Sequence, residues 1–366
     1  MKATSTRTYV INRTCFVLIL TAILGLGCSE KKRELQNSNR KDVLDTLAAR
    51  VIIPAFEDLH TQAQLLVIAA RTFTETPSEN TLGAVRNQWL ETTSAWKRAS
   101  TYTFGPIEDH FLSGGIYYSG VHYANIEKSI QTAGKIDNAF INSQGSSLKG
   151  LKAIEYLLYK DDRVLAEFGA STARKNYLLA LTENLTAQTQ KVLDLWTSGE
   201  QPYRETFVNA TGRELNSSLC ILVNKTIQQV NMIRDERLAM PMGMHREQTP
   251  RTDMIEGRLS KSSVTLLKNE IRSIQNLYSN KGINTLLDQM EATYEGEPLS
   301  ARIDQQFETV YQLTDALPNG LEEAIVTDKE AVKNIHDQLK KLQILLEVDV
   351  VNHLGIILTF SDNDGD

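Results

Sequence analysis

The residues best suited to chemistry lie together in the middle of the chain, where positions 150–159 read Gly-Leu-Lys-Ala-Ile-Glu-Tyr-Leu-Leu-Tyr. In a helix, Lys152, Glu155 and Tyr159 follow one another at steps of three and four residues and share one face. A neighbouring apolar stripe consists of Leu151, Ile154 and Leu158. This periodicity predicts a helix that buries one face and holds an acid–base pair beside it.

The charge states of this pair limit what it can do. A lysine ammonium has a reference pKa of about 10.4, so at neutral pH it offers protons and no lone pair. Loss of that proton would require deep burial or a bound cation nearby. An exposed Lys152–Glu155 pair would contribute only about 0.2–0.5 kcal/mol, whereas removing one partner of a buried pair would be costly. Gly150, directly before the pair, is expected where the helix closely approaches another segment.

This stretch resembles the motif of the imelysin-like family, relatives of an insulin-cleaving membrane protease, in which Gly-x-His-x-x-Glu is followed by Tyr-Leu-Leu. Gly150, Glu155 and residues 156–158 match that motif, and Lys152 stands where the family has its histidine. This single substitution decides how much of the family's chemistry the chain can share.

Three further segments resemble the same family in the same order. They are the first helix around Val-Ile-Ile-Pro at 51–54, the Trp-rich helix with its Phe-Gly-Pro exit at 89–106, and the ending Leu-Gly, apolar segment and Asp-Asn-Asp-Gly-Asp at 354–366. The resemblance thus covers about residues 43–366.

The resemblance implies a ligand site at the motif. In the family's usual pattern, histidine and glutamate three residues apart can both reach one divalent metal, and members are associated with iron or metal uptake and, by name, with peptidase activity. Here Gly150, Lys152 and Glu155 would form the ligand-binding motif. Two interpretations stay open: iron or another divalent metal retained through Glu155, or an internal ammonium in the metal's place.

The expected wall of this site consists of Tyr159, Trp96, Phe104 and Asp109. Trp96 lies on the apolar stripe of its predicted helix, where core packing is the more ordinary role of a tryptophan than ligand stacking. Asp109 and His110 belong to a glycine- and aromatic-rich segment with no helical period. Loops carry function more often than packed faces do, but a solvated loop is the favoured interpretation of these two residues.

The N-terminus has the composition of a targeting segment. Three basic residues precede the apolar run of residues 15–24, namely Lys2, Arg7 and Arg13. Gly27-Cys28 follows and resembles a bacterial lipoprotein cleavage site, so residues 1–28 are expected to be a signal peptide with Cys28 as the lipidated residue. An uncleaved membrane anchor is the alternative. The expected partner is therefore a membrane, and Ser29 is compatible with the outer membrane.

Composition and periodicity predict an all-α protein of two helical bundles with a cleft between them. Of the 366 residues, 41% are hydrophobic and 23% charged, and the net charge of −6 without a basic stripe argues against nucleic acid. Helical patterns occur at about 42–74, 78–103, 123–141, 147–159, 172–196, 203–237, 261–278, 282–294, 299–316 and 329–350. We expect a tether at 29–41, one bundle at 42–200 and a second at 201–366 with an acidic tail. A duplication would explain the two similar halves.

Two remaining features are expected to be structural. Cys220 lies in the apolar run Leu-Cys-Ile-Leu-Val and is expected in the core, without a disulfide. The Asp-rich ending suggests calcium, but it lacks the second half of an EF-hand loop, and a solvated tail is the expected reading.

Three functions fit these observations. The first is a non-catalytic, imelysin-like lipoprotein of the cell envelope that serves iron or metal acquisition and binds a metal or an anionic chelate. The second is a metal-dependent peptidase, which is implied by the family's name alone, because the sequence has no His-Glu-x-x-His and no Gly-x-Ser-x-Gly. No catalytic residue is assigned. The third is an envelope protein-interaction module whose site has decayed.

Overall fold

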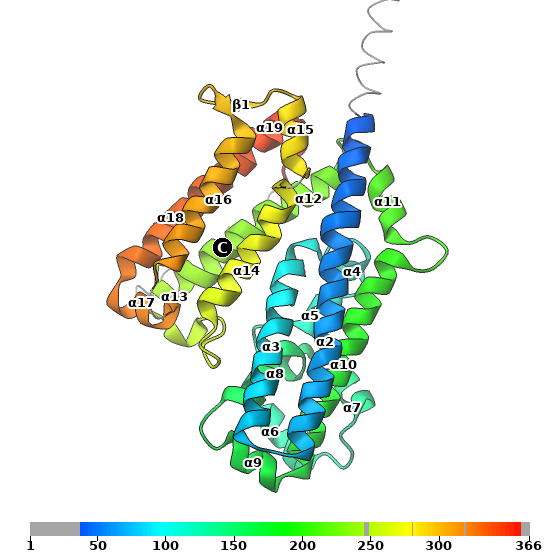
Figure 1. Cartoon of the computed structure of the whole chain (residues 1–366), viewed down its shortest axis with the longest axis vertical. Helices are drawn as coiled ribbons and strands as arrows, with labels where there is room; N and C mark the ends of the chain where they lie inside the picture. The colour runs from blue at the N-terminus through cyan, green and yellow to red at the C-terminus, as the bar shows by residue number, and fades with distance from the viewer. Residues whose placement is uncertain (1–36, 245–248, 280, 318–319, 360–366) are drawn as a thin grey trace, which may run out of the picture.

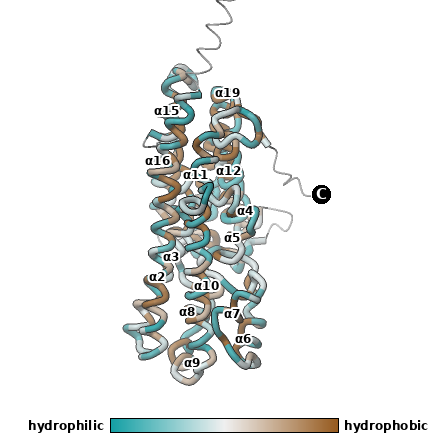
Figure 2. Tube along the Cα trace, turned by 90° about the vertical axis from the view of Figure 1, so that its right-hand side faces the viewer, coloured by the Kyte–Doolittle hydropathy of each residue, from teal (hydrophilic) through white to brown (hydrophobic). Residues whose placement is uncertain are grey.

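The structure is a computed structural model that describes residues 37–244, 249–279, 281–317 and 320–359. Two helical bundles lie side by side along their length (Figure 1). Apolar and polar residues alternate in short runs along the helices (Figure 2), as expected for helices that each bury one face. The prediction of an all-α fold is confirmed.

The expected signal peptide, Cys28, most of the tether and the Asp-rich ending lie outside the described residues. In the described part, no helix is long and apolar enough to cross a membrane. Residues 37–41, which we expected in the tether, are helical. Arg40 attaches this segment to the folded domain. Its buried guanidinium donates hydrogen bonds to the carbonyl oxygens of Gly212 and Leu354, at 2.7 and 2.5 Å.

The first bundle is built on three long helices, α2 (Ile53–Glu75), α3 (Glu79–Ala99) and α10 (Thr172–Thr197). α2 lies between the other two and packs along both. The shorter elements are η1 (Ala48–Ile52), η2 (Ser100–Tyr102), α4 (Pro106–Asp109), α5 (Leu112–Ile116), α6 (Tyr123–Thr132), α7 (Asn138–Asn142), η3 (Ser146–Leu148), α8 (Gly150–Tyr159), α9 (Val164–Ala170) and α11 (Tyr203–Asn209).

The buried stripe predicted for the first long helix is present on α2. Its fully buried members follow at steps of three and four residues: Phe56, Leu59, Ala63, Leu66, Ala70 and Phe73. Directly before Pro54 the chain forms the π-helix η1, in which the amide of Ile53 donates to the carbonyl oxygen of Ala48. This wider turn accommodates a proline ring that carries no N–H group.

α3 begins and ends where the sequence predicts. The Ser78 hydroxyl accepts a hydrogen bond from the Thr81 amide, and the Thr81 hydroxyl accepts one from the Ser78 amide, which together form a capping box. The segment stops at Gly105, whose φ of +58° suits glycine, and Pro106 begins α4. The residues that follow form only the short helices α4 and α5.

The second bundle contains α12 (Ser218–Met232), η4 (Ile233–Ala239), α13 (Met240–Met242), η5 (Thr252–Met254), α14 (Ser263–Tyr278), α15 (Ile283–Gln289), α16 (Leu299–Asp315), α17 (Leu321–Thr327), α18 (Lys329–Ile344), η6 (Leu345–Val350) and α19 (Val351–Leu354). A small antiparallel hairpin pairs β1 (Thr293–Tyr294) with β2 (Glu297–Pro298), with Thr293 opposite Pro298. Cys220 is fully buried on α12, as expected, and its thiol donates to the carbonyl oxygen of Ile357.

Some predicted helices are divided in the structure. The pattern at 123–141 contains both α6 and α7, and the pattern at 203–237 is interrupted after α11. Tyr203 and Phe207 of α11 pack against Trp196 of α10, with ring centroids 5.1 and 5.3 Å apart. α11 therefore belongs with the first bundle, although periodicity assigned it to the second.

The two bundles meet along α3 and α14. At the α3 exit, the hydroxyls of Thr101 and Ser273 lie 2.5 Å apart, and the Tyr102 hydroxyl donates to the carbonyl oxygen of Ser273 at 2.7 Å. The interface is therefore tied by polar groups that are buried in it.

The close approach expected at Gly150 occurs where α8 begins against α5. Gly150 has a φ of +76°, and a Cβ atom there would lie 2.5 Å from the carbonyl oxygen of Ile116 and 2.9 Å from that of Gly115. Both the backbone conformation and the available space therefore require glycine.

We predict that Gly150→Ala lowers the free energy of unfolding by about 2–4 kcal/mol, because it combines left-handed strain with a clash against backbone. Gly134→Ala is the control, since a Cβ there would meet nothing within 4 Å. Urea denaturation of both variants measures the difference. Equal stability of the two variants would contradict the conclusion that position 150 requires glycine.

Candidate functional site

Hydrogen bonds to α3 fix the position of the motif helix α8. The Trp89 indole donates to the carbonyl oxygen of Leu151 at 2.8 Å, and the Tyr159 hydroxyl donates to that of Arg86 at 2.9 Å. In return, Arg86 Nε donates to the carbonyl oxygen of Leu158 at 2.8 Å. α8 is therefore held at both ends, and its acid–base pair faces the neighbouring bundle.

Lys152 and Glu155 form a buried ion pair. Lys152 Nζ lies 2.5 Å from Glu155 Oε2, and the side chains are 12% and 1% exposed. The other oxygen, Oε1, accepts hydrogen bonds from the amide and the hydroxyl of Ser260, at 3.2 and 2.8 Å. Both carboxylate oxygens are therefore engaged by groups of the protein itself.

Ser260 belongs to the irregular segment that joins η5 to α14. Its hydroxyl oxygen also lies 3.0 Å from the carbonyl oxygen of Gly257 and 2.7 Å from the hydroxyl of Ser262. Gly257 has a φ of +68°, which allows the chain to turn there. Sequence periodicity could not identify Ser260, since its segment has none and lies 105 residues from Glu155.

A second buried ion cluster lies between the bundles. Lys97 Nζ contacts Glu256 Oε1 at 2.6 Å and Glu270 Oε2 at 3.2 Å. Arg237 Nε contacts the same two carboxylates at 3.3 and 3.4 Å. Gln229 completes the cluster by donating to Glu270 at 2.5 Å. Arg237 is placed by the π-helix η4, a type of helix that is frequent at functional sites.

Tyr117 lies between the two clusters. Its hydroxyl donates to Glu256 at 2.6 Å, its ring stacks on Trp96 with centroids 6.4 Å apart, and Lys97 Nζ lies 4.5 Å from the ring centroid. Burial and the negative charge of Glu256 raise the pKa of Tyr117 well above its usual value, and Glu155 adds to the effect. The Tyr117 hydroxyl therefore stays protonated and acts as a donor.

The electrostatics of Glu256 follow from its two cations. Burial opposes its charged form, but Arg237 and Lys97 outweigh burial and lower its pKa to about 2. Burial likewise opposes the charge of Arg237, whereas Glu256 and Glu270 raise its pKa well above the usual value. Glu256 and Arg237 therefore favour each other's charged form.

The interface charges balance. The carboxylates are Glu155, Glu256 and Glu270, and the cations are Lys97, Lys152 and Arg237. Within the described residues, no group of three or more His, Cys, Asp or Glu side chains is arranged to hold a metal ion. The donor set at the motif is one carboxylate whose oxygens are already hydrogen-bonded, beside an ammonium. These residues do not fit a coordinated metal.

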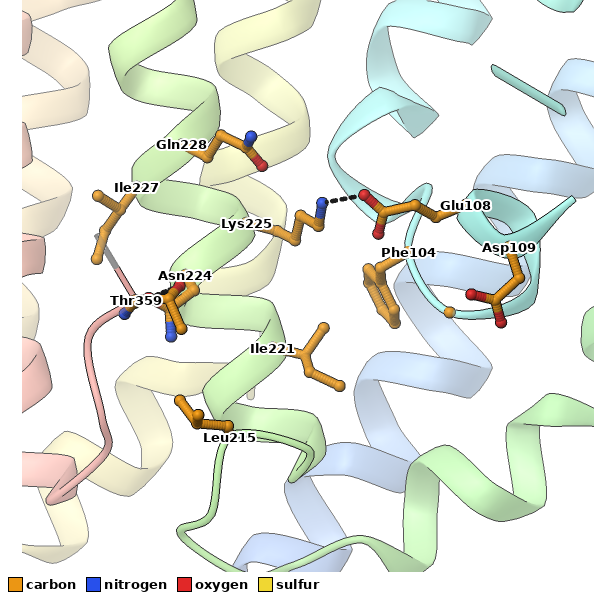
Figure 3. Close-up of a pocket in the computed structure, with 11 residues that line it drawn as sticks. Phe104, Glu108, Asp109, Leu215, Ile221, Asn224, Lys225, Ile227, Gln228 and Thr359 are labelled. Atoms are coloured by element: carbon orange, nitrogen blue, oxygen red, sulfur yellow. Dashed lines mark hydrogen bonds and ion pairs between the residues drawn. The ribbon is translucent and has the colours of Figure 1, made fainter. Parts of the chain in front are cut away.

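The expected wall residues fall into two groups. Tyr159 lies near Glu155: burial raises the pKa of Tyr159, and the charge of Glu155 adds to this effect. Trp96 stacks on Tyr117, which contacts the buried ion cluster. Phe104 and Asp109 instead line a separate cavity (Figure 3). His110 is exposed. Ser260, Glu256, Glu270 and Arg237 were not predicted as part of the site.

The fold and this interface define an all-helical protein of two bundles joined through a buried, charge-balanced centre. The chain belongs to the imelysin family, whose family model matches residues 52–348. No curated protein matches the chain.

Two solved structures resemble the fold closely. An imelysin-like protein from Psychrobacter arcticum 273-4 superimposes with a TM-score of 0.76 at 17% identity, over 88% of this chain and 98% of that one. A protein from Parabacteroides distasonis ATCC 8503, which carries the name iron-regulated protein A precursor, superimposes with a TM-score of 0.72 at 17% identity, over 87% and 95% of the two chains. These likenesses concern the fold.

We predict that Glu155→Gln lowers the free energy of unfolding by about 3–5 kcal/mol, because it leaves the Lys152 ammonium buried without its counterion. The double variant Lys152→Met/Glu155→Gln should recover much of that loss. A double-mutant cycle in urea measures the coupling. Additive effects of the two substitutions would show that the pair does not interact.

The lowered pKa of Glu256 predicts a pH dependence. Because its folded-state pKa lies below the unfolded value of 4.5, its contribution is present above about pH 5 and is lost as the pH falls toward 2. The difference between the unfolded and folded pKa values corresponds to a contribution on the order of 3 kcal/mol to the free energy of unfolding. Glu256→Gln should therefore be less stable than the wild type at pH 7, and the gap should narrow at pH 3. A gap of constant size would contradict this assignment.

Proposed function

We propose that the chain is a non-catalytic, imelysin-family binding lipoprotein of the bacterial cell envelope that takes part in iron or other metal acquisition. Family membership supports the binding role, and the name of the structurally similar Parabacteroides protein supports the link to iron. The apolar run and Gly27-Cys28 support a lipid anchor at Cys28, and Ser29 is compatible with the outer membrane.

One observation carries the proposal that this member works without a metal at the motif. Lys152 donates to Glu155 where the resemblance places a metal-binding histidine, and Ser260 occupies the remaining oxygen. An ammonium supplies positive charge to the carboxylate but no lone pair to a metal. The motif therefore keeps a cation next to Glu155, and that cation belongs to the chain itself.

The same geometry weighs against the other readings of the motif. A peptidase mechanism needs a free base or an activated water, and both oxygens of Glu155 are engaged. The geometry also gives little support to an anionic chelate bound at Lys152, because Glu155 already neutralises the ammonium. If the protein binds no metal, the hypothesis that remains is a protein-interaction module whose ancestral site has decayed.

We predict that the wild-type protein takes up no stoichiometric metal at this centre, whereas Lys152→His binds about one equivalent of zinc or iron, because the imidazole restores a ligand three residues from Glu155. The apo proteins are equilibrated with Zn²⁺, Fe²⁺ or ferric citrate, desalted and analysed by mass spectrometry for metal content. Lys152→His/Glu155→Gln is the control and should lose the gained metal.

Two results would overturn parts of this proposal. Metal bound by the wild type and lost in Glu155→Gln would show that the motif coordinates metal despite its lysine. If neither wild type nor Lys152→His takes up metal, the metal branch fails and the interaction module is favoured. Chelator-sensitive cleavage of an unfolded protein substrate, abolished by Glu155→Gln, would establish the peptidase instead.

A further inference from the structure

A groove separate from the Lys152–Glu155 pair runs between α12 of the second bundle and the segment 100–118 of the first. It consists of two adjoining cavities of about 440 and 420 Å³. Both are lined by Glu108, Lys225 and Gln228, so the cavities adjoin each other along one face of α12. Their volumes fall in the range of about 300–1,000 Å³ that is usual for small-molecule sites.

An ion pair crosses the groove where the two cavities meet. Lys225 Nζ lies 2.8 Å from Glu108 Oε1, and both side chains are partly exposed (Figure 3). In the first cavity, Phe104 and Ile221 provide apolar surface. On its far side, Asn224 Oδ1 accepts a hydrogen bond from the Thr359 amide at 2.7 Å, which fixes the chain that closes this end.

The second cavity is lined mainly by uncharged hydrogen-bonding groups. Its hydroxyl and carboxamide side chains are Ser100, Thr101, Thr103, Ser113, Tyr118, Ser146, Gln228 and Gln229. Among the residues that the structure describes, four of these make no side-chain hydrogen bond to another residue: Ser113, Tyr118, Ser146 and Gln228. Several neutral donors and acceptors therefore face one cavity without a partner in the described part of the protein, so a ligand can take the place of solvent on them.

Phe111 lines the second cavity with an exposed aromatic ring and an unfavourable backbone conformation. Its side chain is 86% exposed, and its backbone has a φ of +52°, a left-handed conformation that a bulky residue adopts at a cost. Neither core packing nor turn geometry explains a phenylalanine here, since asparagine or glycine would suit the backbone better. Tyr118, 44% exposed, offers a second aromatic ring to the same cavity.

The charges of the groove limit its ligand. Its lining contains two carboxylates, Glu108 and Asp109, and one ammonium, Lys225, which is paired with Glu108. An anionic ligand would therefore meet an excess of negative charge. The unused groups in the second cavity are uncharged, so they match a ligand that is itself neutral and carries many hydroxyls.

We propose that this groove binds a neutral, hydroxyl-rich ligand, an oligosaccharide. The rings of Phe111 and Tyr118 would pack against the C–H faces of sugar rings, while the unused hydroxyls and the Gln228 carboxamide pair with sugar hydroxyls, each of which both donates and accepts. This site shares no residue with the Lys152–Glu155–Ser260 centre. Its test is therefore independent of the metal experiment.

Isothermal titration of the full chain with neutral hexasaccharides tests the proposal. The probes are maltohexaose, cellohexaose, xylohexaose and the fully N-acetylated chitohexaose, with hexagalacturonate as the anionic comparison. At least one neutral probe should bind, and hexagalacturonate should bind at least tenfold more weakly than that probe. Absence of binding by every neutral probe at millimolar concentration, or preference for the anionic one, would overturn the proposal.

Variants locate the binding in the groove. Gln228→Ala and Phe111→Asn should each weaken the binding of the neutral probe by about tenfold or more. Phe111→Asn should also raise the melting temperature, because asparagine suits the left-handed backbone, and this result shows that the variant folds. Ile68→Ala removes an exposed apolar side chain from α2, and Gln131→Ala removes an exposed carboxamide from α6. Both control variants should bind as the wild type does, and unchanged binding in the groove variants would overturn the assignment.

Discussion

The requirement that buried charges be compensated governs the contact between the two bundles. A carboxylate or ammonium that leaves water loses several kcal/mol of solvation, and only close counterions and hydrogen bonds restore it. Here the carboxylates Glu155, Glu256 and Glu270 are matched by three cations within the interface. Lys97 comes from α3, whereas its partners Glu256 and Glu270 belong to the second bundle, so the charge of Lys97 is compensated only when the bundles are packed together. The interface is thereby specific as well as stable.

Lys152 follows the same rule at the motif helix. A buried glutamate needs positive charge nearby, and a metal ion or an ammonium can supply it. With Lys152, the compensation is built into the chain and does not depend on a ligand. What is lost is the open coordination position of a metal site. Any ligand function of this member is then expected on another surface, and the groove along α12 offers hydrogen-bonding groups that the protein leaves unused.

Much of the fold could be predicted from local sequence. The stripe on α2, the Ser78 cap and the stop at Gly105 each depend on residues within one or two helical turns, and the structure contains all three. The break after α11 was missed, because periodicity continues on both sides of a loop. The short helices α9 and α17 were missed as well, since seven residues carry too little periodic signal.

The site was only half predictable for a related reason. Gly150, Lys152 and Glu155 are neighbours in sequence, so a motif can reveal them. Glu256 and Ser260 lie in an irregular segment more than a hundred residues away, and only tertiary packing brings them to the site. Phe104 and Asp109 lie close in sequence to the α3 exit, but they line the groove, a placement that depends on tertiary packing.

The central claim is that the Lys152 ammonium occupies the place of a metal beside Glu155. Anomalous diffraction from crystals of the wild-type protein soaked in Zn²⁺ or Fe²⁺, recorded at the metal's absorption edge, tests it most directly. We predict no anomalous peak within bonding distance of Glu155, with Lys152 Nζ still hydrogen-bonded to the carboxylate. A metal peak bonded to Glu155, with Lys152 displaced or itself coordinating, would contradict it.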